Sequence, residues 1–175
     1  MVKRGVFIGR FQPIHNGHIK ALSEILKEVD EVIMVIGSAQ CSHSFNNPFT
    51  AGERITLVKN ALDENGIDPN RYYLIPVPDT NDNRIWVAHL VSLTPSFEIV
   101  YTHNPLVKRL LTESGYKIKE PTLFQRDTYS ATKIRLAILK GEPWEKFVAT
   151  SVAKSIKDMG GIERIREIGE TKLKF

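Results

Sequence analysis

The sequence predicts a doubly wound α/β domain built on a five-stranded parallel sheet, and three observations carry this prediction. Short apolar runs alternate about five times with segments whose apolar residues recur at helical spacing. The connections between the runs are too long for hairpins, as expected for parallel strands joined by right-handed crossovers. The run EVIMVIG at 31–37 is almost continuously apolar, which is typical of a parallel strand covered on both faces.

Each element follows from its local pattern. The first strand, 6–8, is apolar and ends at Gly9, and the apolar residues from Asn16 to Val29 fall on one helical face. Thr50 and Glu53 form a capping-box pattern that predicts a helix start. Further strands are expected at 31–37, 72–77, 97–101 and 116–118. Further helices are expected at 84–93, at 106–114, from about Ser130, and in a C-terminal region at about 143–170.

The composition indicates one soluble globular domain spanning 1–175. Hydrophobic residues make up 42% and charged residues 25% of the 175 residues. The single cysteine, Cys41, excludes an intramolecular disulfide and favours a reducing, cytoplasmic setting. The N-terminal apolar run is too short for a signal peptide, and no stretch approaches the roughly 18–20 apolar residues of a membrane span. We therefore expect no membrane partner.

The net charge of +4 suits a small anionic substrate. The lysines and arginines form no long blocks, so the sequence does not favour nucleic acid as a partner.

The stretch GRFQPIHNGH, Gly9 to His18, directly follows the first predicted strand. Ligands of such sheets bind beyond the carboxyl ends of the strands, and Gly9 lets the backbone approach one closely. Asn16 is the predicted N-cap of the next helix, which places His18 in its first turn, where free N–H groups favour anions. Two imidazoles and the guanidinium of Arg10 are suited to phosphate oxygens. Neither a Walker loop nor the G-x-G-x-x-G dinucleotide pattern is present.

A zinc site is the alternative for these histidines. His15, His18, Cys41 and His43 together could supply four ligands. However, C-x-H is not a common structural zinc spacing, and a predicted strand separates the two pairs. We therefore expect no zinc.

Polar residues also follow the second and third strands. Ser38 and Gln40 can reach the phosphates or ribose of a substrate. Asp79, Asn83 and Trp86 can hydrogen-bond to a planar ring and stack on it. Trp86 fits a core position equally well.

A second candidate anion site lies late in the chain. Ser130 and Thr132 follow Tyr129 at a predicted helix start, and Arg135 lies about one turn further on. Two anion-binding helix starts at one end of a sheet suggest that a polyphosphate spans them. Nothing resembles a nucleophile with an orienting base. Direct phosphoryl or nucleotidyl transfer needs only such positioning and charge neutralisation.

These motifs resemble a known family. G-R-F-Q-P-x-H-x-G-H with a late S-x-T-x-x-R is similar to the nucleotidyltransferase superfamily marked by H-x-G-H and I-S-S-T-x-x-R. Further segments narrow the resemblance to the archaeal nicotinamide mononucleotide (NMN) adenylyltransferases. These segments are IGSAQ at 36–40, NPFTAGER at 47–54, NPLV at 104–107 and YS at 129–130. The match is collinear from about Lys3 to Arg166. It implies a Rossmann-like nucleotidyltransferase fold.

The resemblance implies that ATP and NMN react to give NAD and pyrophosphate. Mg²⁺ would arrive with ATP, without ligands from protein side chains. His15 and His18 would hold the ATP phosphates, and His18 would stabilise charge developing at the α-phosphorus. Arg10 and Arg135 would hold the departing β- and γ-phosphates. The 5′-phosphate of NMN is itself the nucleophile, so no covalent enzyme intermediate is expected.

The resemblance also implies two binding sets and an assembly. The ATP and phosphate site comprises Gly9, Arg10, Phe11, His15, His18, Asn104, Tyr129, Ser130, Thr132 and Arg135. The NMN and NAD site comprises Ser38, Gln40, Asp79, Asn83 and Trp86. The family resemblance further implies a homo-oligomer, a hexamer.

The chain departs from the family pattern at four places: Ala131 stands where Gly is common, Thr102-His103 replaces Ser-Gly, Leu136-Ala137 replaces a basic pair, and Asn46 stands where some relatives have Arg. These departures leave the catalytic set intact and bear on affinity and on the choice of acceptor. The alternative acceptors are nicotinic acid mononucleotide, FMN and phosphopantetheine; the cluster of Asp79, Asn83 and Trp86 favours a flat pyridine ring but does not distinguish the amide from the acid. A non-catalytic nucleotide-binding module is the alternative from another class, which the retained His18 and Arg135 disfavour.

Overall fold

The computed structural model describes residues 1–122, 124 and 129–173. Contacts within the chain divide it into two compact units. The first unit comprises Met1–Arg10, Ala21–Ala39 and Asp68–Thr122, and the second comprises Phe11–Lys20, Gln40–Ile67 and Leu123–Phe175. The single domain spanning 1–175 stays a prediction.

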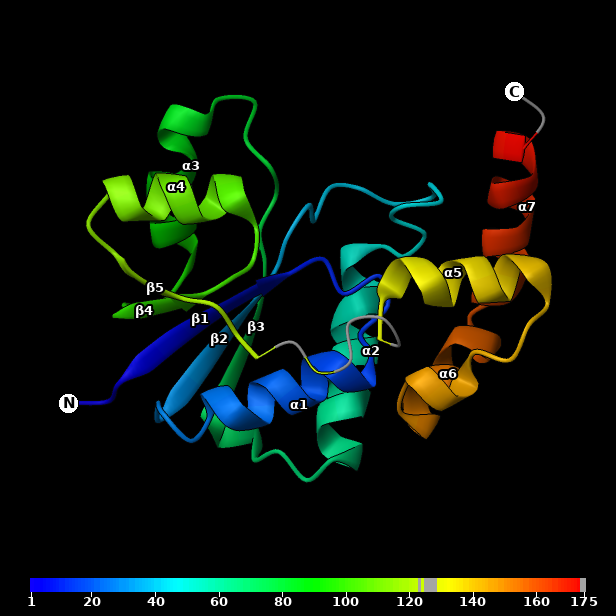
Figure 1. Cartoon of the computed structure of the whole chain (residues 1–175), viewed down its shortest axis with the longest axis horizontal. Coiled ribbons are helices and arrows are strands. Elements are labelled where there is room, and N and C mark those ends of the chain that lie inside the picture. The colour runs from blue at the N-terminus through cyan, green and yellow to red at the C-terminus, as the bar shows by residue number, and fades with distance from the viewer. Residues whose placement is uncertain (123, 125–128, 174–175) are drawn as a thin grey trace. The chain divides into compact units, whose positions relative to one another are not determined.

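The first unit holds a five-stranded parallel sheet, which confirms the predicted fold class (Figure 1). The strand order is β3-β2-β1-β4-β5. The strands are β1 (Arg4–Gly9), β2 (Glu31–Ile36), β3 (Tyr72–Pro76), β4 (Ile99–Tyr101) and β5 (Lys117–Lys119). In the register, Gly9 pairs with Ile36 and Ile36 pairs with Pro76, so the carboxyl ends of β1, β2 and β3 are level.

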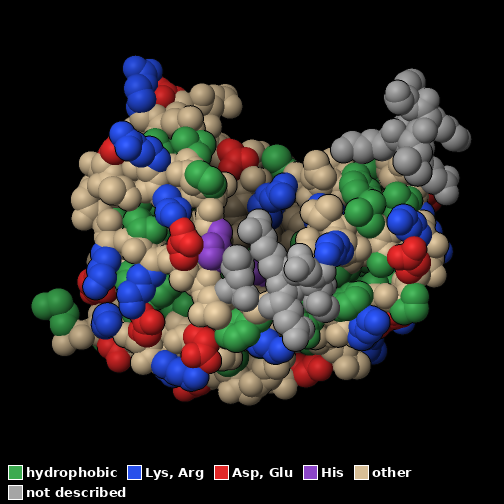
Figure 2. Space-filling model, viewed as in Figure 1, with side chains coloured by type: hydrophobic (Ala, Val, Ile, Leu, Met, Phe, Trp, Pro, Cys, Tyr) green, Lys and Arg blue, Asp and Glu red, His purple; other side chains and the backbone are tan. Residues whose placement is uncertain are grey.

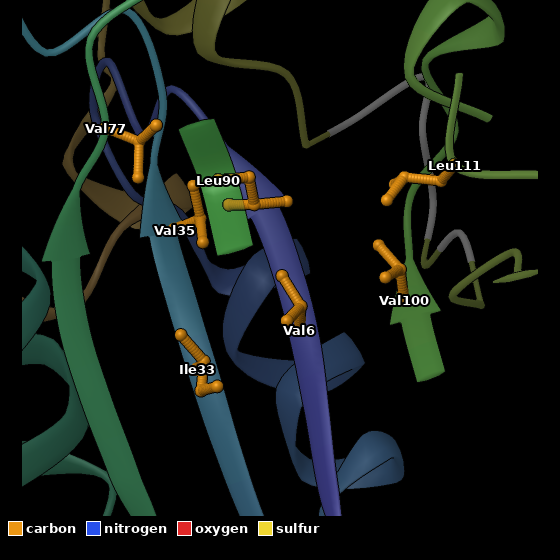
Figure 3. Packing of buried hydrophobic residues seen from close by; sticks show 7 residues of the cluster. All are labelled: Val6, Ile33, Val35, Val77, Leu90, Val100 and Leu111. Atoms are coloured by element: carbon orange, nitrogen blue, oxygen red, sulfur yellow. The ribbon is translucent and has the colours of Figure 1, made fainter. Parts of the chain in front are cut away.

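Helices α3 (Asn83–Leu93) and α4 (Pro105–Glu113) cover one face of this sheet (Figure 1). Successive side chains of a strand point to opposite sides of the sheet, so every second residue points toward these helices. Leu90 of α3 and Leu111 of α4 pack against those residues (Figure 3). The buried cluster comprises Val6, Ile33, Val35, Val77, Leu90, Val100 and Leu111.

Helix α1 (Asn16–Ile25) begins one residue earlier than an N-cap at Asn16 implies, and it ends four residues earlier than the apolar pattern suggested. Leu26 and Val29 are buried as expected, although Leu26 lies in a turn and Val29 in irregular structure. The guanidinium of Arg71 donates to the carbonyls of Leu26 and Val29, each at 2.8 Å, and to the carbonyl of Asp30 at 2.9 Å. A distant side chain therefore satisfies carbonyls that a longer helix would have used internally.

The short strand β5 is an edge of the sheet. Ile118 packs against the core cluster, whereas Lys117 and Lys119 on either side of it are exposed. The predicted strand, 116–118, was placed one residue too early. Lys117 to Lys119 pair with Ile99 to Tyr101 of β4, and this pairing fixes the register.

The second unit is helical. Its helices are α2 (Ala51–Glu64), α5 (Ala131–Lys140), α6 (Thr150–Asp158) and α7 (Gly161–Leu173), with the short helix η2 (Glu145–Phe147). Thr50 is the N-cap of α2 and forms the predicted capping box with Glu53. Helix α2 packs on α6, and α7 packs on both α5 and α6. The predicted helical region at 143–170 is confirmed. Within the described residues, no helix is both long and apolar enough to cross a membrane.

Candidate active site

The loop that follows β1 has an unusual backbone conformation at Phe11. Its φ angle is +51°, a left-handed value that is uncommon for a bulky residue. Such conformations persist only where the surroundings impose them, and they gather at functional sites. The Phe11 side chain is 2% exposed, and its ring contacts the ring of His18 edge-on with centroids 4.9 Å apart. This backbone conformation therefore places the Phe11 ring against the imidazole of His18.

His15 and His18 form one compact pair. Their rings stack with centroids 3.6 Å apart and planes 21° apart. The backbone N–H of His15 donates to Nδ1 of His18 at 3.2 Å. His18 lies in the first turn of α1, as predicted, but the helix begins at Asn16 itself. Asn16 is thus not the N-cap, since its side chain donates to the carbonyl of Lys146 at 3.2 Å.

Both imidazoles are held neutral. Burial lowers the pKa of His15 to about 4. Burial, and then repulsion from His15, lower the pKa of His18 well below its usual range. Because Nδ1 of His18 accepts a hydrogen bond, the neutral ring carries its proton on Nε2. His18 can therefore donate from Nε2 to an anionic oxygen without carrying a charge of its own.

Tyr129 and Gly17 complete the surroundings of His15. The Tyr129 ring lies nearly parallel to the His15 ring, with centroids 6.5 Å apart, and Nζ of Lys20 lies 5.1 Å from the Tyr129 ring centroid. A Cβ added at Gly17 would lie only 2.9 Å from Cβ of Tyr129 and 3.1 Å from Nδ1 of His15. The glycine of H-x-G-H thus leaves room for the histidine. Nδ1 of His15 is buried and has no hydrogen-bond partner among the described residues.

Arg135 lies inside the second unit and is 2% exposed. Its Nη1 donates to the carbonyl of Gln12 at 2.8 Å, and its Nη2 donates to Oγ1 of Thr132 at 3.2 Å. Its guanidinium carbon lies 5.6 Å from the ring centroid of Phe45. The structure therefore brings Arg135 to the H-x-G-H loop, although the two are far apart in sequence.

Helix α5 begins near Ser130, as predicted; Ser130 is its N-cap, but the side chain makes no capping hydrogen bond. The hydroxyl and the first N–H groups of α5 are suited to an anion. Ser130 and Tyr129 are half-buried, and Thr132 is exposed.

In the first unit, the predicted residues follow the carboxyl ends of the strands. The N–H of Gly37 donates to the carbonyl of Gly9 at 2.9 Å, and the N–H of Ala39 donates to the carbonyl of Val77 at 3.2 Å. These hydrogen bonds continue the backbone pairing of the sheet past the carboxyl ends of β1, β2 and β3. Between them, Ser38 adopts a φ angle of +48°. A second strained residue thus stands at the end of the strand next to β1.

The predicted ring-binding residues lie at the start of α3. Asp82 caps this helix by accepting from the N–H of Arg84 at 2.9 Å, and Asn83 is the first helical residue. Asp79 and Asn83 are exposed. Trp86 is half-buried and packs against the core cluster. The indole therefore contributes to packing and remains partly accessible.

Asn104 has a structural role in the first unit. Its Oδ1 accepts from the N–H of Val107 at 3.1 Å and caps α4. The proposed contact of Asn104 with ATP stays a prediction. Among the other predicted residues, Gly9 ends β1, and Arg10 and Gln40 are exposed.

Two features of this site lay beyond the sequence argument. The motif residue Gln12 had no predicted role, yet it is 1% exposed and forms hydrogen bonds with both Arg135 and Phe49. Phe45 covers the guanidinium of Arg135. In the sequence, the only signal for Gln12 was its place beside a proline in a glycine-bounded loop.

The surface charges are mixed. On the face shown in Figure 2, Lys and Arg side chains are interspersed with Asp and Glu side chains. In the part of the chain that the structure describes, no group of three or more His, Cys, Asp or Glu side chains is arranged to hold a metal ion.

Comparison with known proteins identifies the family. A model of the cytidylyltransferase-like family matches residues 6–137. The chain is 54% identical over 166 residues to a nicotinamide-nucleotide adenylyltransferase of Pyrococcus furiosus, covering 94% of this chain and 88% of the relative. The chain belongs to the nicotinamide-nucleotide adenylyltransferase family. Within this family it is 52% identical to the protein of Thermococcus kodakarensis, over 95% of this chain and 88% of that relative. It is 49% identical to the protein of Picrophilus torridus, over 96% of this chain and 98% of that relative.

Solved structures support the fold of this family member. A bifunctional NMN adenylyltransferase/ADP-ribose pyrophosphatase of Francisella tularensis, crystallised with AMP and a manganese ion, superposes with a TM-score of 0.78 at 20% identity. The superposition covers 96% of this chain and 52% of that protein, so the chain spans about half the length of this bifunctional relative. A second structure of the same protein gives a TM-score of 0.80 over 99% of this chain and 54% of that protein.

Proposed function

We propose that this chain transfers AMP from ATP to the 5′-phosphate of nicotinamide mononucleotide, giving NAD and pyrophosphate. The observation that carries the proposal is the 54% identity, over 94% of the chain, to a protein with this activity in its name. The paired neutral imidazoles beside the start of α1 add independent chemical support.

The reaction is a direct displacement. An oxygen of the NMN 5′-phosphate attacks the α-phosphorus of ATP and forms the new P–O bond. The bond between the α-phosphorus and the bridging oxygen to the β-phosphorus breaks, and pyrophosphate leaves with that electron pair. Such a transfer requires alignment and charge stabilisation rather than a protein nucleophile. No covalent enzyme intermediate is formed.

His18 stabilises the transition state through its Nε2–H, which donates to an oxygen on the α-phosphorus as negative charge develops. His15 supports this ring by stacking and by its N–H bond to Nδ1, and its own ring contacts phosphate. Arg135 and Arg10 neutralise the departing pyrophosphate. Ser130 and Thr132 contribute hydroxyls at the start of α5, beside Tyr129.

The substrate form of ATP is its Mg²⁺ complex, in which the ion offsets phosphate charge. Mg²⁺ is commonly bound through substrate phosphates and water rather than by a protein cage. A related fold holds AMP and a manganese ion, which supports divalent-metal use. Gly9, Phe11 and Asn104 complete the ATP set.

Ser38, Gln40, Asp79, Asn83 and Trp86 bind the mononucleotide. The indole of Trp86 stacks on the pyridine ring, and Asp79 and Asn83 bind polar groups of the ring and ribose. We further propose a cytoplasmic location and a homo-oligomer, on the strength of the family alone.

A product assay tests the proposal. Purified chain with ATP, Mg²⁺ and a panel of NMN, nicotinic acid mononucleotide, FMN and phosphopantetheine should form NAD and pyrophosphate from NMN. Efficient adenylylation of FMN or phosphopantetheine without NAD formation would overturn the acceptor assignment. Nucleotide binding without any product would instead favour a non-catalytic module.

A further inference from the structure

Gln12 is a buried polar residue for which the proposed reaction provides no task. Its side chain is 1% exposed. Nε2 of Gln12 donates to the carbonyl of Phe49 at 2.8 Å, and the N–H of Phe49 donates to Oε1 of Gln12 at 3.0 Å. The side-chain amide thus pairs with a backbone peptide group as a neighbouring strand would. This pairing ties the H-x-G-H loop to the segment before α2.

The backbone of the same residue contacts the candidate phosphate ligand. The carbonyl of Gln12 accepts a hydrogen bond from Nη1 of Arg135 at 2.8 Å. Nη2 of Arg135 bonds to Thr132 in the first turn of α5. A guanidinium is planar with donors in fixed directions, so a bond to one Nη sets the orientation of the whole group. The position of the Gln12 carbonyl therefore governs the direction in which Arg135 presents its other donors.

The anchor on which Gln12 depends is itself fixed. Phe49 is fully buried, and the carbonyl of Pro48 accepts from Nη1 of Arg164 at 3.1 Å. Both Nη atoms of Arg164 bond to the carboxylate of Glu53, at 2.7 and 2.9 Å. Glu53 also completes the capping box of α2. The backbone next to Phe49 is thus tied to α7 and α2.

We propose that Gln12 is a positioning residue, whose side-chain amide fixes the backbone carbonyl that orients Arg135 toward the transferred phosphates. This inference rests on the proposed function. Without the amide, the carbonyl and the guanidinium lose their fixed direction, while the residues of the mononucleotide set are untouched. Removing the amide should therefore slow the chemical step, which lowers kcat, and leave the binding of NMN unchanged.

Kinetics of two variants of the full chain test the inference. Gln12→Met keeps the side-chain volume but removes both bonds to Phe49. We expect kcat to fall about 10- to 100-fold, as for misplaced catalytic groups, with the KM for NMN near its wild-type value. Gln12→Glu keeps the acceptor and loses the donor while ionised. Protonation restores an O–H donor, so the ratio of its kcat to the wild-type kcat should rise as the pH falls.

A double mutant separates positioning from general packing. If Gln12 acts through Arg135, Gln12→Met should cause little further loss of kcat in an Arg135→Met background. Multiplicative losses would overturn the inference. The matched control is Asn60→Ala. This change removes the hydrogen bond that the side-chain amide of Asn60 donates to Oγ of Ser155, elsewhere in the second unit. It should lower the melting temperature and leave kcat unchanged.

The outcomes distinguish the two proposals. If the wild-type chain forms no NAD, the proposed function fails. If the wild type is active and folded Gln12→Met retains the wild-type kcat, the positioning role is wrong. If neither Gln12 variant folds, the amide serves folding and the positioning role is rejected.

Discussion

The backbone N–H of His15 donates to Nδ1 of His18 while the two imidazole rings stack at a centroid distance of 3.6 Å. One residue thereby fixes both the tautomer and the ring plane of the other. The Nε2–H of His18 is consequently a preorganised donor, which needs no reorganisation when charge develops on a phosphate.

The first prediction concerns this donor. His18→Ala should lower kcat by about 10²–10³, or roughly 3–4 kcal/mol, because the lost hydrogen bond is strongest in the transition state. The Kd for ATP should change far less. Steady-state kinetics and equilibrium ATP binding measure the two effects. His43→Ala, at an exposed histidine after β2, is the control. A near-wild-type kcat in His18→Ala would remove His18 from the mechanism.

The second prediction concerns acid stability. The unfolded chain protonates His15 below a pH of about 6.5, whereas the folded chain resists protonation until its pKa of about 4. Stability is therefore fully present above pH 6.5 and is lost as the pH falls toward 4, by roughly 3 kcal/mol. Urea unfolding of His15→Asn across this interval should give a flatter stability profile than the wild type. Parallel wild-type and His15→Asn profiles would contradict the prediction.

The third prediction concerns two glycines. Gly17→Ala places a methyl group 2.9 Å from Cβ of Tyr129 and 3.1 Å from the His15 ring, so one of them must move. Activity should fall by up to about 100-fold through this displacement. Gly52 lies in α2 with nothing within 4 Å of an added Cβ. Gly52→Ala should keep the wild-type kinetics and raise the unfolding free energy by about 0.5–1 kcal/mol. Equal kinetics in both variants would exclude a packing role for Gly17.

The fourth prediction concerns Trp86, which packs only partly against the core. Trp86→Ala should raise the KM for NMN about five- to a hundredfold, by analogy with base stacking worth roughly 1–3 kcal/mol. Because the indole is half-exposed, the loss of stability should stay below the roughly 3–5 kcal/mol of a fully buried aromatic residue. Trp86→Phe should recover part of the affinity.

The control for Trp86 is Phe97→Ala. Phe97 packs on the same cluster and stacks on Tyr116 with ring centroids 4.9 Å apart. It precedes β4, whereas the candidate ligand-binding residues follow the carboxyl ends of the strands. Its truncation should reduce stability and leave the KM for NMN unchanged. An unchanged mononucleotide KM in folded Trp86→Ala would assign Trp86 to the core alone.

The fold was predictable because its signals are local. The apolar run at 31–37 and the capping box of Thr50 and Glu53 each specify an element within a few residues. The end of α1 was missed because Arg71, more than 40 residues away, satisfies the carbonyls of Leu26 and Val29.

The candidate site was predicted as a set of residue types, whereas its geometry left no signal in the sequence. The histidine pair was visible in the sequence, whereas the bond from His15 to Nδ1 of His18 depends on backbone angles. The bonds from Gln12 to Phe49, 37 residues away, and to Arg135, 123 residues away, leave no periodic pattern. Contacts at such separations arise only from the folded chain.

The edge strand β5 affects how the molecules behave at high concentration. An outer strand presents unpaired N–H and C=O groups on which another chain could add a strand. Strand β5 has only three residues, and both lysines that flank Ile118 are exposed. A second molecule pairing there would have to desolvate the ammonium of Lys117 and the ion pair of Lys119 with Glu28. The two lysines therefore disfavour edge-to-edge pairing, and we expect that changing both to valine would promote aggregation at this edge.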